Sequence, residues 1–157
     1  MKCRQYLLDS NIVIIIWRKY PNLFNDIEKN NYVDFIISKD IARELSQKEF
    51  KTYNGIQILS DKFLNILGHV LEEEVNVLED KLNVNIKRNE RAGVFIINDN
   101  KISTSDFNLL CICNRHEEFI LVTEDKKLIS SATLIFDSTR VLNFVEFIDD
   151  IKEYLYF

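Results

Sequence analysis

Short apolar runs along the chain alternate with longer segments in which apolar residues recur every three or four positions. The short runs predict strands over residues 4–9, 32–38, 118–125 and 132–137. The longer segments predict helices over residues 12–20, 23–30, 39–50, 61–85, 104–115 and 140–155. Strands that alternate with helices are typical of a parallel sheet flanked by helices. The pattern therefore predicts an α/β fold with three layers, α/β/α, around a central parallel sheet.

Hydroxyl side chains mark the points where several of these helices should begin. Ser38 precedes "KDIARELSQKEF", Ser60 precedes the next helix, and "STSD" at 103–106 forms a strong N-cap. The run "GVFIIND" at 93–99 fits a strand or a helix equally well. The sequence alone does not decide between these two elements.

A stripe of apolar residues runs along the expected 61–85 helix. Its members are Leu64, Leu67, Leu71, Val75, Leu78 and Leu82. Such a stripe usually packs into the core, but this one is long for so small a domain. A face for a partner or for a second copy of the chain is the alternative.

Length and composition place the chain among ordinary globular domains. It has 157 residues, 46% of them hydrophobic and 29% charged, so a single domain over 1–157 is expected. The net charge of −5 argues against a simple electrostatic binder of nucleic acid, but leaves room for a nuclease that uses metal ions. Three cysteines without a disulfide framework suggest the cytoplasm, and no apolar run reaches the ~18 residues of a membrane helix.

Asp9 stands out because it lies inside the apolar stretch "QYLLDSNIVIII". An ionised carboxylate in apolar surroundings needs hydrogen bonds, an opposite charge or a bound cation. Asp9 therefore either marks a turn that reaches water or contributes to a site.

Three further acids share this placement in the predicted fold. Asp125 follows the strand at 118–125, Asp106 lies in the first turn of a helix, and Glu44 lies one turn into the helix after the second strand. In open parallel sheets, ligands bind beyond the carboxyl ends of the strands. Four carboxylates gathered there repel one another unless they are protonated or bound to a cation. Oxygen ligands without His or Cys favour Mg²⁺ or Mn²⁺.

Each acid also has a purely structural interpretation when it is taken alone. Asp9 could be a turn residue at the end of a strand, and Glu44 a solvated helix glutamate. Asp106 could simply favour the positive end of a helix dipole, and Asp125 could belong to the turn "TEDKK". The combination of all four favours a site.

The segments "YLLDSN", "IARELSQ", "STSDFNLLCICN" and "ILVTEDKKL" resemble the signature segments of PIN-domain nucleases, in that family's order. The resemblance spans about residues 5–148, and the first and last segments are the most specific. It implies a PIN-like fold and a metal-dependent endoribonuclease that hydrolyses RNA phosphodiester bonds. It also assigns roles. Metal-binding and catalytic roles fall on Asp9, Glu44, Asp106 and Asp125, and supporting roles on Ser10, Asn11 and Thr123. Asp40, one turn before Glu44, is a weaker supporting candidate.

Within this family the chain most resembles VapC-type toxins of type II toxin–antitoxin systems. The resemblance implies Mg²⁺ or Mn²⁺ as cofactor, RNA as substrate, a small antitoxin protein as partner and a possible homodimer. Two alternatives remain inside the family: an inactive scaffold module, or a nuclease that acts in RNA processing. A phospho-receiver domain fits poorly, because Ser10 and Asn11 stand where an adjacent acid is expected.

Overall fold

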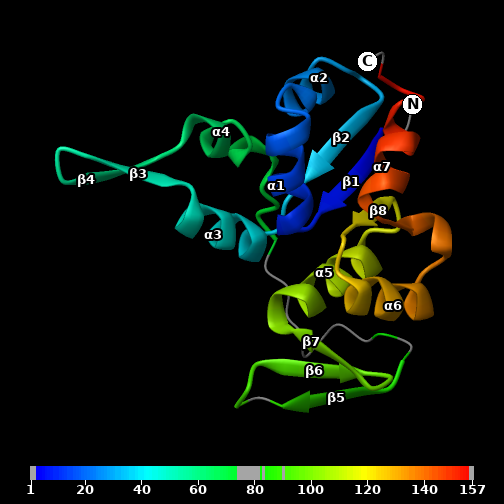
Figure 1. Cartoon of the computed structure of the whole chain (residues 1–157). Coiled ribbons are helices and arrows are strands. Elements are labelled where there is room, and N and C mark those ends of the chain that lie inside the picture. Colours follow the sequence, from blue (N-terminus) through cyan, green and yellow to red (C-terminus); the bar gives the residue numbers. More distant parts are fainter. Residues whose placement is uncertain (1–2, 74–81, 83, 90, 156–157) are drawn as a thin grey trace.

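The computed structural model describes residues 3–73, 82, 84–89 and 91–155 (Figure 1). Its centre is a four-stranded parallel sheet with the strand order β2-β1-β8-β9. The strands are β1 (Arg4–Leu8), β2 (Val33–Ile36), β8 (Phe119–Val122) and β9 (Val141–Leu142). Beyond β2, a parallel bridge between Ile37 and Val70 extends the sheet by one residue pair. The mixed α/β architecture and the parallel sheet are confirmed, and the arrangement is compatible with three layers.

Helices connect these strands. The longer ones are α1 (Ser10–Lys19), α2 (Leu23–Glu28), α3 (Lys39–Lys48), α5 (Thr104–Arg115), α6 (Lys126–Ile135) and α7 (Phe144–Ile151). Short turns of helix are α4 (Asp61–Leu64), η1 (Leu67–His69) and η2 (Ser138–Arg140). The described part of the chain contains no helix with the length and apolar character needed to cross a bilayer.

Aromatic contacts fasten α7 to the sheet beside α1. The Tyr6 ring of β1 packs edge-to-face on Phe147, with ring centroids 4.9 Å apart. Tyr20, which ends α1, lies 6.0 Å from the Phe144 ring. Helices α5 and α6 instead lie along β8 and β9 (Figure 1). The fully buried strand β8 therefore stands at the centre of the core.

Two small antiparallel sheets lie outside the central parallel sheet, and the sequence-based prediction missed most of both. The first is the hairpin of β3 (Phe50–Tyr53) and β4 (Ile56–Leu59), which projects from the end of α3 (Figure 1). Its turn has φ of 49° at Asn54 and 78° at Gly55. Asn-Gly is the preferred pair for such a turn, so the signal for this hairpin is present in the sequence.

The second small sheet has three strands, β5 (Ile86–Asn89), β6 (Val94–Ile97) and β7 (Asn100–Ser103). The ambiguous run at 93–99 is thus a strand that ends in a turn. The Phe95 ring of β6 stacks on Phe107 of α5 at 3.9 Å, and this contact joins the sheet to the core.

The predicted strand over 132–137 is wrong, because residues 126–135 form α6. Asp125 caps this helix, and the residues buried within it are Leu128, Ser131 and Ala132. These positions recur every three or four residues and so follow helical periodicity. The run of apolar residues after Ala132 hid this pattern, because short apolar runs fit either kind of element.

The predicted helix over 61–85 is also wrong where the structure describes it. Ser60 does cap a helix, but α4 ends at Leu64 and only the single turn η1 follows. Leu64 and Leu67 are 45% and 43% exposed, whereas Leu82 is buried. Val75 and Leu78 lie outside the described residues. The stripe therefore does not form one continuous core face.

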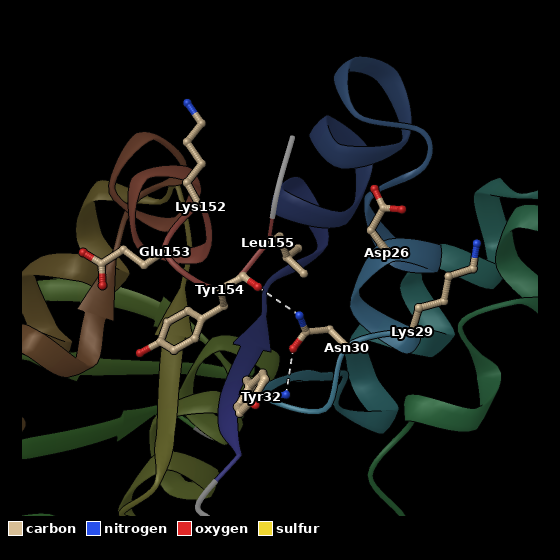
Figure 2. Close-up of a pocket in the computed structure, with 8 residues that line it drawn as sticks. All are labelled: Asp26, Lys29, Asn30, Tyr32, Lys152, Glu153, Tyr154 and Leu155. Atoms are coloured by element: carbon tan, nitrogen blue, oxygen red, sulfur yellow. Dashed lines mark hydrogen bonds between the residues drawn. The ribbon is translucent and has the colours of Figure 1, made fainter.

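A surface pocket of about 540 Å³ lies at the end of the sheet where β1 and β2 begin (Figure 2). The Asn30 side chain crosses it, donating to the Tyr154 carbonyl at 2.9 Å and accepting from the Tyr32 amide at 2.7 Å. Its charged lining is mixed in sign, with Asp26, Lys29, Lys152 and Glu153. Nothing in this pocket selects one class of ligand.

The Phe95–Phe107 stack yields a test of the core. Phe107 is 2% exposed, so Phe107→Ala should lower the free energy of unfolding by about 3–5 kcal/mol. Tyr53→Ala is the matched control, because Tyr53 is 67% exposed and its loss should change stability by about 0.5 kcal/mol or less. Urea unfolding of both variants measures the difference. Equal effects would show that the stack does not belong to the core.

Candidate metal-binding acidic site

Asp9 directly follows β1, and its backbone continues the ladder to β8. The Asp9 amide donates to the Val122 carbonyl at 3.0 Å. The side chain is the N-cap of α1, where its Oδ1 accepts from the Ser10 amide at 2.8 Å. Its Oδ2 accepts from the Thr123 hydroxyl at 2.6 Å. Asp9 is only 5% exposed, so it is not a turn residue that reaches water.

The Thr123 hydroxyl links the first acid to the last. It donates to Asp9 and accepts from the Asp125 amide at 3.1 Å. Asp125 caps α6, and its Oδ1 accepts from the amides of Lys127 and Leu128 at 2.9 and 3.1 Å. Thr123 is fully buried. The two acids therefore flank one hydroxyl at the carboxyl end of the neighbouring strands β1 and β8.

Glu44 reaches the same edge of the sheet from α3. Its Oε1 accepts from the Ser10 hydroxyl at 3.2 Å, and the ammonium group of Lys48 lies 3.9 Å from the same oxygen. Ser10 thus connects Glu44 to α1, whose N-cap is Asp9. Glu44 is a half-exposed acid anchored at this edge.

Asp106 lies in the first turn of α5, where Ser103 is the N-cap and accepts from the Asp106 amide at 3.2 Å. Burial raises the pKa of Asp106 to about 7, helped by the charges of Asp9, Asp125 and Glu44, while a hydrogen bond with Ser103 lowers it. Thr123 connects Asp9 to Asp125 by hydrogen bonds, and Ser10 connects Glu44 to α1. Asp106 interacts with these acids through charge alone.

The pKa of Asp9 is also raised, and the first cause is burial. The hydrogen bonds from Thr123 and the Ser10 amide lower this pKa, whereas the charges of Glu44 and Asp125 raise it. The two hydrogen bonds thus do not offset the effects of burial and of neighbouring negative charges on the pKa of Asp9. The site is energetically unfavourable when every acid is charged and no cation is near.

In this conformation, no three His, Cys, Asp or Glu side chains among the described residues form a group that could hold a metal ion. Both carboxylates that cap helices are turned toward backbone amides, as described above. The donor chemistry fits a hard divalent ion nevertheless, because four carboxylates and two hydroxyls offer oxygen alone.

The remaining predicted residue, Asn11, takes part in positioning rather than in the acidic group. Its Oδ1 accepts from the Glu124 amide at 3.4 Å, and Glu124 Oε1 accepts from the Phe144 amide at 2.9 Å. The sequence reading gave Asp40 a weak supporting role and missed its partner Asn108, whose Nδ2 donates to Asp40 at 2.5 Å. Asn108 interrupts the apolar part of "STSDFNLLCICN", which singles out the residue but does not indicate its partner.

Comparisons with known proteins add no family to this geometry. No model of a known protein family matches the chain, and a search of curated proteins finds no match either. The chemistry of the acidic site and the sequence resemblance are the features that bear on function.

The Thr123 hydrogen bond can be tested without changing the shape of the side chain. Thr123→Val leaves the buried Asp9 carboxylate short of one donor, so its pKa should rise further and stability at pH 8 should fall by about 1–3 kcal/mol. The loss should shrink toward pH 4, because the raised pKa of Asp9 makes it take up a proton at a higher pH than an ordinary carboxyl does. Thr123→Ser keeps the hydroxyl and should retain most of the stability. Urea unfolding at pH 8 and pH 4 measures the stability of both variants. Equal losses of stability in the two variants would contradict the assigned hydrogen bond.

The raised pKa of Asp106 predicts a pH dependence of folding. Its pKa is about 7 in the fold against the usual 3.8, so its contribution is fully present below about pH 4 and is lost as pH rises through 7. Asp106→Asn removes this dependence. Without divalent ions, the variant should match the wild type at pH 4 and exceed it at pH 8 by about 1–2 kcal/mol, a value discounted for partial exposure. Parallel curves of unfolding free energy against pH would refute this.

Proposed function

We propose that this chain is a metal-dependent endoribonuclease with a PIN-like fold. The observation that carries the proposal is the pair Asp9 and Asp125, which flank Thr123 at the carboxyl end of β1 and β8. Glu44 is linked to this edge through Ser10, and Asp106 interacts with these acids through charge. Strand order reverses at β1, because β1 pairs with β2 on one side and with β8 on the other. Such a switch point is where open α/β sheets bind ligands. The resemblance to PIN-domain nucleases supplies the substrate class.

The acids Asp9, Glu44, Asp106 and Asp125 would hold Mg²⁺ or Mn²⁺. When bound, such an ion positions a phosphodiester, lowers the pKa of a water molecule and stabilises the leaving oxygen. The chain's own contribution is orientation: Thr123 fixes the Asp9 carboxylate, and Ser10 fixes Glu44. Orienting hydrogen bonds of this kind typically strengthen metal affinity about 10–100-fold.

We further propose that the protein is the toxin of a toxin–antitoxin pair, as the resemblance to VapC-type proteins implies, and that it acts in the cytoplasm. The three cysteines are free, which agrees with a reducing compartment. A small antitoxin would find exposed apolar side chains at Leu64 on α4 and Leu67 on η1. An RNA-processing role with the same chemistry and an inactive scaffold are the alternatives.

Cleavage of RNA by the purified chain tests the proposal. Single-stranded RNA of mixed sequence should be cut with Mn²⁺ or Mg²⁺ and left intact with EDTA. Asp9→Asn should lower the cleavage rate by about 100-fold or more, because the transition state loses several kcal/mol of stabilisation. Asp149→Asn is the control, because Asp149 is an exposed acid on α7.

Two outcomes would redirect the assignment. Metal-dependent cleavage that survives Asp9→Asn would place the active site elsewhere. Calorimetric titration with Mn²⁺ that shows no binding, together with no cleavage, would favour the scaffold alternative.

A further inference from the structure

One side-chain hydrogen bond joins the two helices that bring Glu44 and Asp106 to the site. Asn108 on α5 donates from Nδ2 to Asp40 Oδ2 on α3 at 2.5 Å. Asp40 precedes Glu44 by four residues, so both lie on the same face of α3, one turn apart. Asn108 follows Asp106 by two residues in the first turns of α5. The bond therefore spans α3 and α5 close to both acids.

Side chains do not fill the whole space between α3 and α5. Between them lies a cavity of about 240 Å³ whose lining includes Asp40, Asn108, Arg43 and Ile112. A hydrogen bond beside such a cavity restrains how far the two helices can move relative to each other.

The position of Asn108 is also costly for the fold. Its Oδ1 is buried and has no hydrogen-bond partner in the described structure. An unpartnered buried acceptor is unfavourable, and the neighbours Phe107 and Leu109 are both core residues. An apolar side chain would suit this helix position better if packing were the only demand. The end of the amide that does have a partner is Nδ2, which binds Asp40.

We propose that Asp40 and Asn108 form a positioning pair that holds α3 against α5 and thereby fixes Glu44 relative to Asp106. The other connections in the site follow the same scheme. Thr123 joins Asp9 to Asp125, and Ser10 joins α1 to Glu44, while the Asp40–Asn108 bond connects α5 to α3. Its importance for metal binding and catalysis rests on the proposed function.

Variants of the pair separate positioning from simple stabilisation. Asn108→Asp places two carboxylates opposite each other, and Asn108→Leu removes the donor without adding charge. Both should weaken Mn²⁺ binding by about 10–100-fold and lower kcat comparably, while the KM for RNA changes by less than about twofold. The double variant Asp40→Asn with Asn108→Asp restores an amide–carboxylate bond in reversed order. It should recover Mn²⁺ affinity and kcat to within about threefold of the wild type.

Arg43→Gln is the matched control. Arg43 Nη1 lies 3.8 Å from the other oxygen of Asp40, and its side chain is 71% exposed. Its removal should leave Mn²⁺ affinity and kcat unchanged, because the Asn108 bond stays intact. Calorimetric titration with Mn²⁺ and urea unfolding are run on all variants, so that affinity is measured on protein known to be folded.

The outcomes distinguish this inference from the proposed function. If the wild type binds Mn²⁺ and the Asn108 variants bind equally well with only lower stability, the pair is merely structural and the inference is overturned. A reversed pair that stays as weak as Asn108→Asp overturns it too. A wild type that neither binds Mn²⁺ nor cleaves RNA overturns the proposed function itself, and the positioning role with it.

Discussion

The hydrogen bond from the Thr123 hydroxyl to Asp9 is the interaction on which the acidic site depends. A carboxylate that is 5% exposed needs donors, and the neighbouring strand supplies one because β1 and β8 pair with Leu8 opposite Val122. Asp9, the residue after β1, therefore lies next to Thr123, the residue after β8. The same hydroxyl accepts from the Asp125 amide, so the start of α6 is fixed by the same contact. One hydroxyl thus relates two strands, two acids and the helices α1 and α6 that begin there.

This geometry places charges where the fold alone gains little from them. Three helices, α1, α5 and α6, begin at this edge of the sheet with Asp9, Asp106 and Asp125 at or near their first residues. Each helix N-terminus favours a nearby anion. Burial and mutual repulsion outweigh this attraction, since the pKa of Asp9 is raised and that of Asp106 reaches about 7. A cation or a proton is required to make the group favourable, and such groups are typical of functional sites.

The features that could be predicted from the sequence are those set by residues close together in the chain. Strand β8 is a continuous apolar run, and β1 ends in the apolar residues Tyr6 to Leu8. The caps Ser38 and Ser103 act within three residues, so these strands and caps could be predicted. The Asn54–Gly55 turn is equally local, and that hairpin was recognisable. The Asp40–Asn108 pair is different, because the two residues are far apart in sequence and meet only after α3 and α5 have docked. Neither residue carries a pattern that names its partner, so no periodicity or spacing argument could find this contact.

The negative charge of the acids is the property that helix capping alone does not require. Asn caps a helix about as well as Asp does, so Asp9 and Asp125 could be asparagines without loss of either N-cap. A Gln at position 44 could still accept from Ser10, and an Asn at position 106 would still present its backbone amide to Ser103. Each such replacement would remove repulsion from the group. What the four carboxylates offer beyond these neutral alternatives is negative charge on oxygen, concentrated at a switch point of the sheet. That property matches the requirement of a hard divalent ion, and capping and packing do not account for it.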